Sequence, residues 1–149
     1  MENQKSIAET ENEIIEDFKL LDSWDEDQKY EYIIDMGKKL PELEERYKTA
    51  ENIIKGCQST VWLAADFSNG KVYFKADSNS VITKGLISML IQVLSGRTAD
   101  EIITARLDFI NKIGMHSHLA QTRSNGLLSM VKQMKNYALA FKAKQTQHQ

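Results

Sequence analysis

The stretch STVWLAADFSNGKVYFKAD, residues 59–77, decides the fold class. Both of its halves are rich in β-branched and aromatic residues, a composition typical of strands. The Asn69-Gly70 pair between the halves is a strong hairpin signal, because both residues tolerate a positive φ. We therefore expect two antiparallel strands joined by a tight turn.

Helical patterns precede this hairpin. Apolar residues recur at helical spacing from about residue 7 to residue 21. A Ser23-x-x-Glu26 capping box then predicts a second helix, from Trp24 to about Leu40, which Pro41 ends. The charged stretch of residues 42–56 is less periodic and predicts a surface connection leading to the hairpin.

Helical patterns also follow the hairpin. Residues 80–96 form a long apolar run, which predicts a helix buried on most sides. A Thr98-x-x-Glu101 capping box predicts a helix to about Ile113, with Gly114 as its stop. Residues 124–143 predict a last helix.

The order of elements is helices, a small antiparallel sheet, then helices. This order indicates an α+β fold, because a parallel sheet needs strands and helices in alternation. A chain of 149 residues with 42% hydrophobic residues fits one compact domain spanning residues 1–149. We expect residues 1–6 and 143–149 to be frayed.

Composition argues against several classes of protein. The formal net charge is −2, so there is no basic excess to neutralise nucleic-acid phosphates. No window approaches about 18 consecutive apolar residues, so we expect no membrane span. The polar, acidic N-terminal stretch is unlike a secretory signal, and one cysteine cannot form an internal disulfide. These features predict a cytoplasmic location.

The one cysteine, Cys57, stands in the turn KGCQS just before the first predicted strand. A lone cysteine is by default a small buried hydrophobic residue. Here Gly56 permits the close approach of another backbone, and Lys55 would favour the nucleophilic thiolate. These neighbours favour a reactive thiol without specifying its reaction.

Two histidines keep an enzymatic alternative open. His116 and His118 fall in a predicted loop that could fold back toward Cys57 and form a Cys-His thiol enzyme. The simpler interpretation is that each forms hydrogen bonds within its own loop. One cysteine and three histidines fall short of a structural zinc site, so we expect no metal.

Three further polar residues are candidates. Asp77 and Ser78 precede the long apolar helix, and we expect one of them to be its N-cap. Arg123 is predicted to lie just before the last helix, and an isolated surface arginine is usually solvated. If that loop lies near Cys57, the guanidinium could pair with an anionic group of a partner protein.

Four blocks, taken together, show a family resemblance that covers residues 24–131. In order they are YIIDMGKKLPEL, GCQSTVWL, ADSNSVITKGLISMLI and HLAQTRSNGLLSMV. In this order and spacing the chain resembles the SufE family, the sulfur acceptors that work with SufS-type cysteine desulfurases. The resemblance implies a small antiparallel sheet packed against helices, a fold shared with IscU-type scaffold proteins.

The resemblance also implies a function. Cys57 would take the terminal sulfur of a persulfide on the desulfurase, stimulate that enzyme, and pass the sulfur on to an iron–sulfur scaffold. The chain would need no cofactor of its own, whereas the desulfurase would carry PLP. A second cysteine nearby would resolve the persulfide into a disulfide, so a single thiol is consistent with a carrier that is not itself an enzyme.

Supporting or partner-binding roles are expected for four residues: Gly56, Gln58, Asp77 and Arg123. The resemblance places Arg123 near the cysteine loop and the partner surface, and Gln58 beside the nucleophile. The chain departs from the family pattern twice. HLAQTR lacks a proline that the family usually has before the arginine, and Asn79 replaces a frequent acidic residue, which alters the charge near the cysteine loop.

A second class of protein shares the implied fold, namely the IscU-like scaffold on which clusters are assembled. Such scaffolds hold iron with several cysteines, and this chain has one. For the carrier we expect the Cys57 side chain to be partly or fully shielded in the free protein, with an outward swing of its loop when the desulfurase binds.

Overall fold

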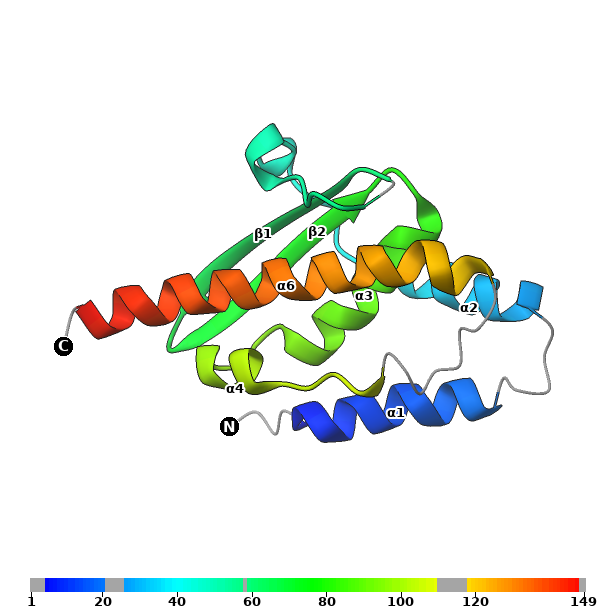
Figure 1. Ribbon diagram of the computed structural model, residues 1–149, viewed down its shortest axis with the longest axis horizontal. Coiled ribbons are helices and arrows are strands. Elements are labelled where there is room, and N and C mark those ends of the chain that lie inside the picture. Colours follow the sequence, from blue (N-terminus) through cyan, green and yellow to red (C-terminus); the bar gives the residue numbers. More distant parts are fainter. Residues whose placement is uncertain (1–4, 21–25, 58, 110–117, 148–149) are drawn as a thin grey trace.

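The computed structural model describes residues 5–20, 26–57, 59–109 and 118–147. Within these ranges, the side chains of residues 26–27, 118–125 and 146–147 lie outside the description. Its elements are α1 (Ile7–Leu20), α2 (Glu26–Lys38), the 3₁₀ turns η2 (Glu45–Tyr47) and η3 (Ala50–Asn52), β1 (Val61–Ser68), β2 (Lys71–Ser78), α3 (Val81–Leu94), α4 (Ala99–Thr104) and α6 (His118–Gln147) (Figure 1). The α+β order predicted from the sequence is confirmed.

The predicted hairpin is confirmed in its strands and its turn. β1 and β2 pair antiparallel from Val61 opposite Ser78 to Ser68 opposite Lys71. Asn69 and Gly70 have φ of 53° and 79°, the two positive values that a tight primed turn requires. One face of the hairpin is therefore free to bury its side chains against helices.

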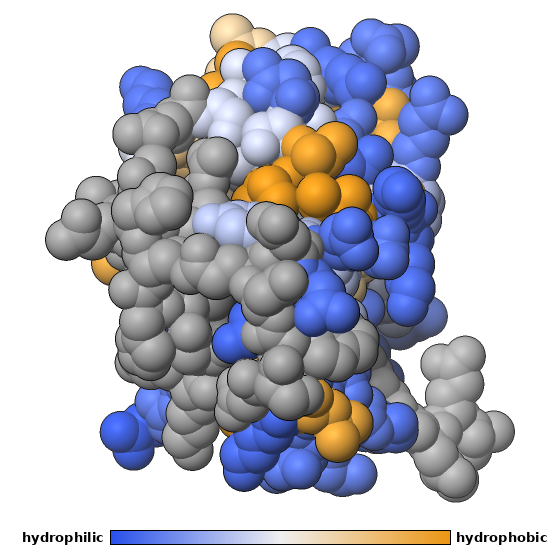
Figure 2. Space-filling view, turned by 90° about the vertical axis from the view of Figure 1, so that its right-hand side faces the viewer, coloured by the Kyte–Doolittle hydropathy of each residue, from blue (hydrophilic) through white to orange (hydrophobic). Residues whose placement is uncertain are grey.

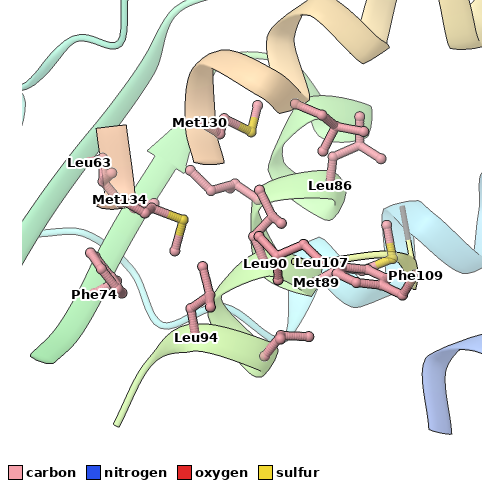
Figure 3. Close-up of a cluster of buried hydrophobic side chains, with 14 of the residues drawn as sticks. Leu63, Phe74, Leu86, Met89, Leu90, Leu94, Leu107, Phe109, Met130 and Met134 are labelled. Atoms are coloured by element: carbon pink, nitrogen blue, oxygen red, sulfur yellow. The ribbon is translucent and has the colours of Figure 1, made fainter. Parts of the chain in front are cut away.

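Helices α3 and α6 cover this face of the hairpin, and α6 runs along it in Figure 1. Between these layers lies the core. Figure 3 shows Leu63 of β1 and Phe74 of β2 facing Met130 and Met134 of α6, with Leu90 of α3 beside them. Leu63, Leu90 and Met134 are fully buried. The long helix α6 is therefore attached to the sheet through its hydrophobic side.

α2 and α3 pack backbone against backbone at two glycines. A Cβ atom on Gly85 would lie 2.0 Å from the carbonyl oxygen of Ile33, and one on Gly37 would lie 2.8 Å from the amide nitrogen of Gly85. The buried Ser88 hydroxyl donates to the Met36 carbonyl across the same contact, at 2.9 Å. The helices can approach this closely only because neither glycine carries a side chain.

α1 packs against α3, and its buried residues are Ile14, Ile15 and Phe18. Arg97, only 4% exposed, links the two helices. Its guanidinium donates to the carbonyl of Val93 at 3.0 Å, and to atoms at the start of α1, the Lys5 carbonyl and the Thr10 hydroxyl. The N-terminal helix is thus attached to the domain by polar as well as hydrophobic contacts.

Two of the predicted helix N-caps can be compared with the structure, and one of them is corrected. The Thr98–Glu101 capping box opens α4 as predicted. The N-cap of α3 is Ser80, whose hydroxyl accepts from the Thr83 amide, so the prediction of Asp77 or Ser78 is wrong. The Ser23 box lies outside the described residues.

The predicted helix from residue 98 to about 113 is also corrected, because α4 ends at Thr104. After it the chain turns inward and buries Leu107 and Phe109, with Leu107 at a φ of 56°. The ammonium group of Lys135 donates to the carbonyls of Ile103 and Ala105. This satisfies groups that the end of α4 leaves without a helical partner.

The last helix is longer than predicted at both ends. α6 already begins at His118 and continues to Gln147, past the point where fraying was expected. Phe141 stacks on Phe67 near the hairpin turn, with ring centroids 5.2 Å apart, which ties the distal half of α6 to the sheet. In the described part of the chain, no helix is long and apolar enough to cross a bilayer.

Candidate functional site

Cys57 lies on a loop whose base is firmly held. This loop, residues 55–60, is called the cysteine loop below. At its base the Ile54 amide donates to the Val61 carbonyl at 2.9 Å. On its return side the Thr60 amide donates to the side-chain oxygen of Asn79 at 3.1 Å, and the hydroxyls of Ser59 and Thr83 lie 2.8 Å apart. These bonds anchor both ends of the loop to the sheet and to α3.

The tip of the cysteine loop leans on α6. Gly56 has a φ of +95°, and a Cβ atom there would lie 2.5 Å from the hydroxyl oxygen of Ser129. Both the backbone conformation and the close approach therefore require glycine. This gives Gly56 a concrete structural role, which is to let the chain turn directly against the helix.

The Cys57 thiol is held on the same helix, one turn before Ser129. It donates to the carbonyl oxygen of Gly126, with 3.8 Å between sulfur and oxygen. The side chain is half-buried and packs against the edge of the hydrophobic core. The expectation that Cys57 is at least partly shielded in the free protein is confirmed.

Burial raises the pKa of the Cys57 thiol above its ordinary value, because the charged thiolate is poorly solvated there. The Gly126 carbonyl adds to this preference, since it accepts a hydrogen bond from the thiol and has none to give to a thiolate. Our expectation that Lys55 would favour the thiolate is therefore wrong for the free protein. The docked position protects the sulfur and keeps it protonated.

The rate of Cys57 alkylation by iodoacetamide, measured against pH, tests this description. We expect the folded protein to show a midpoint above that of the urea-unfolded chain, because only the folded thiol is buried. For the same reason, Cys57 destabilises the fold as pH rises past the ordinary thiol pKa of about 8.5, since the unfolded chain loses its proton first. Coinciding alkylation profiles would contradict the description.

Asp77 is a structural anchor between β2 and its neighbours. Its carboxylate, 14% exposed, lies 3.3 Å from the Lys48 ammonium and 3.2 Å from that of Lys84. Burial alone would raise the pKa of Asp77, but a hydrogen bond from the Ser78 amide and the two lysines outweigh it and hold the pKa below its ordinary value. The described interactions of Asp77 do not involve Cys57.

We expect Asp77→Asn to lower the free energy of unfolding at neutral pH by about 1 to 2 kcal/mol, because two half-buried cations lose their counter-charge. A depressed carboxyl pKa stabilises the fold above the ordinary value of about 3.9 and loses this effect as pH falls through the folded pKa. The gap between wild type and variant should therefore close in acid. Urea titrations at neutral and acidic pH measure it, and a gap independent of pH would refute the assignment.

Several candidate residues cannot be placed in this site. Gln58 and His116 lie outside the described residues, as do the side chains of His118 and Arg123. The backbone of Arg123 does belong to α6, three residues before Gly126, and not to a loop before the last helix. The positions of Arg123 and His118 relative to the thiol stay predictions.

The surface around the cysteine loop offers features that suit contact with another protein. A groove of about 430 Å³ runs between residues 51–55 and α6, where Ser129, Lys132, Gln133 and Asn136 line it. Val81 at the start of α3 and Leu128 on α6 are 61% and 64% exposed. Figure 2 shows a group of hydrophobic side chains exposed at the end of the molecule that carries α2, bordered by hydrophilic ones.

Comparison with known proteins places this arrangement in a family. The sequence model named SufE, described as an Fe-S metabolism associated domain, matches residues 12–138. The chain belongs to the SufE family. The chain is similar to an uncharacterized SufE-like protein of Rhizobium meliloti, 39% identical over 132 residues that cover 85% of this chain and 93% of that protein.

Further SufE-like relatives extend the comparison. One from Synechocystis is 38% identical over 82% of this chain and 77% of its own length. SufE-like protein 1 of Arabidopsis thaliana, described as chloroplastic/mitochondrial, is 43% identical over 78% of this chain, which corresponds to 32% of that longer protein. The family as a whole is associated with iron–sulfur metabolism.

The fold has a solved counterpart as well. The solution structure of a hypothetical protein from Thermus thermophilus covers 88% of this chain and 94% of its own, with a TM-score of 0.70 and 16% sequence identity. At this identity the likeness concerns the fold alone. Within the described residues of this SufE family member, no cluster of three or more His, Cys, Asp or Glu side chains could hold a metal ion.

Sequence reasoning missed three residues that shape the site. Gly126 and Ser129 form the surface of α6 on which the cysteine loop lies, and Asn79 holds its return side. An isolated glycine inside a helical pattern often has a packing reason, so Gly126 carried a usable signal. Asn79 was noted only for its lack of charge.

Proposed function

We propose that this SufE family member accepts sulfur on Cys57 from the persulfide of a SufS-type cysteine desulfurase, stimulates that enzyme, and passes the sulfur on for iron–sulfur cluster assembly. The supporting observation is a single thiol at the tip of a loop whose base is fixed and whose tip rests on α6. Such a loop can release the thiol without disturbing the sheet. We assign the exchange to the cytoplasm, where a lone thiol stays reduced.

The transfer step is a displacement at sulfur. The Cys57 thiolate attacks the terminal sulfur of the donor persulfide, a new S–S bond forms at Cys57 as the donor S–S bond breaks, and the donor cysteine leaves as a thiolate. One sulfur atom moves with no external oxidant or reductant. The reaction requires thiolate on Cys57, which the docked position disfavours, so the loop must leave α6 before attack.

A protein partner can supply the reason for that movement. The exposed hydrophobic side chains of Val81 and Leu128 belong to the two helices that frame the cysteine loop, and burying them against a desulfurase would favour association. The chain acts as a carrier and not as an enzyme in this scheme. PLP chemistry takes place on the desulfurase, whose product is the persulfide.

Intact mass spectrometry tests the proposal. Mixed with a SufS-type desulfurase and cysteine, the protein is expected to gain about 32 Da for each added sulfur atom. Cys57→Ala is the control, and it should gain nothing. Wild-type protein that gains no sulfur, or a Cys57→Ala variant that gains as much as wild type, would refute the proposal.

A further inference from the structure

Gly126 is an unusual residue for its position. It lies inside the long helix α6, where glycine costs about 1 kcal/mol relative to alanine. A Cβ atom there would meet, among the described residues and apart from its own helix backbone and chain neighbours, one heavy atom within 4 Å. That atom is the sulfur of Cys57, at 3.7 Å. Among the described residues no close contact therefore requires this glycine, and its one neighbour is the thiol.

The docked thiol has no room for a second sulfur in the direction of its hydrogen bond. An S–S bond is about 2.05 Å long, and the Gly126 carbonyl oxygen lies 3.8 Å from Sγ. A sulfur that replaced the thiol proton on this line would fall well inside contact distance of the oxygen. A loaded Cys57 must therefore direct its outer sulfur elsewhere.

No side chain of the described residues other than Cys57 lies within 4 Å of the point, next to the carbonyl, where a side chain at position 126 would begin. The vacant Cβ position is 3.7 Å from Sγ, so an atom bonded to Sγ and directed there would occupy the volume that the Cβ of any other residue takes. Gly126 itself is buried, and the Cys57 side chain beside it packs against the edge of the core. This space is shielded and free of competing side chains among the described residues.

We propose that the missing side chain of Gly126 forms the subsite that holds the transferred sulfur of the Cys57 persulfide. The inference rests on the proposed function, because it concerns the loaded form of that carrier. Gly126 is a positioning residue in this scheme and takes no part in bond making. It lets the loaded loop return to α6, where the outer sulfur is protected from reductants.

The subsite can be tested without a desulfurase. Inorganic polysulfide loads a thiolate directly, since the thiolate takes one sulfur from S₄²⁻ and releases S₃²⁻. Wild type, Gly126→Ala and Leu139→Ala are loaded in this way, and the decay of the sulfur adduct in dithiothreitol is followed by intact mass. Leu139→Ala is the matched control, because it is an exposed position on the same helix, well beyond the cysteine loop.

We expect the Gly126→Ala persulfide to decay about tenfold faster than that of wild type, because an added methyl group displaces the outer sulfur into solvent. Leu139→Ala should decay at the wild-type rate. The free thiol, unlike the persulfide, should be little affected by the added methyl group, since 3.7 Å between that Cβ and Sγ is an ordinary contact distance. In Gly126→Ala, the alkylation rate of the free thiol should stay within about twofold of the wild-type rate. The midpoint of its pH profile should stay within about half a pH unit of the wild-type midpoint.

The contrast between thiol alkylation and persulfide decay distinguishes the loss of a sulfur subsite from a general loosening of the cysteine loop. A loosened loop would speed both reactions. Equal persulfide decay in wild type and Gly126→Ala, or equal acceleration of thiol alkylation and persulfide decay, would overturn the inference. The variant should fold, because alanine favours the helix. If polysulfide-loaded wild type shows the expected protection but gains no sulfur from a desulfurase, the proposed function fails and the subsite stands.

Discussion

Replacing Cys57 with serine is expected to abolish stimulation of the desulfurase. In a turnover assay with excess cysteine, wild-type protein should speed alanine release, whereas Cys57→Ser should leave the enzyme at its unstimulated rate. The reason is that only a thiolate attacks the donor persulfide, and a serine hydroxyl stays protonated and is a weak nucleophile toward sulfur. We expect sulfur uptake by the variant to fall about 100-fold or more, to background.

The variant keeps the fold, which makes the result interpretable. Serine matches the shape of cysteine and can donate to the Gly126 carbonyl in the same way. Its melting temperature should lie within about 3 °C of wild type. Ser129→Ala is a second control, because it changes the same contact between loop and helix and leaves the thiol intact. Full stimulation by Cys57→Ser, or normal maturation of iron–sulfur enzymes in cells that rely on it, would contradict the sulfur-carrier function.

The parts of this protein that the sequence predicted are those that local chemistry determines. Asn69-Gly70 specifies the turn through its own backbone preferences, and the Thr98–Glu101 box closes on itself within one helical turn. The four family blocks pointed to Cys57 by resemblance instead, and its role as sulfur acceptor stays a prediction. None of these inferences needs knowledge of what lies across the molecule.

The parts that were missed depend on partners distant in the chain. Cys57 and Gly126 are 69 positions apart, so nothing near the cysteine shows that α6 shelters it. The error about Lys55 has the same origin, because burial against α6 and the core decides the pKa of the thiol. The early end of α4 likewise has a distant partner, because Lys135, 30 residues after Ala105, donates to the carbonyls left free there.

Gly85→Ala is expected to cause a large loss of stability. The added Cβ would lie 2.0 Å from the carbonyl oxygen of Ile33 and 2.6 Å from its side chain. A helix carbonyl is fixed by its neighbours and cannot rotate away, so α2 must move off α3. That movement loosens the packing of Ile33 and Leu86, each 1% exposed. We expect a cost of about 3 to 5 kcal/mol and a fall in melting temperature of about 10 °C.

Gly126→Ala is the matched control for this prediction, because it makes the same change inside a helix with no contact closer than 3.7 Å among the described residues. Its melting temperature should equal or exceed that of wild type. Gly37→Ala, whose Cβ would lie 2.8 Å from the Gly85 amide, strikes the same contact and should cost less. Once either alanine has separated the helices, the second finds space already made. The double variant should therefore lose less stability than the sum of the losses in the two single variants. Additive losses, or a Gly85→Ala variant as stable as wild type, would show that α2 and α3 do not depend on close contact at their glycines.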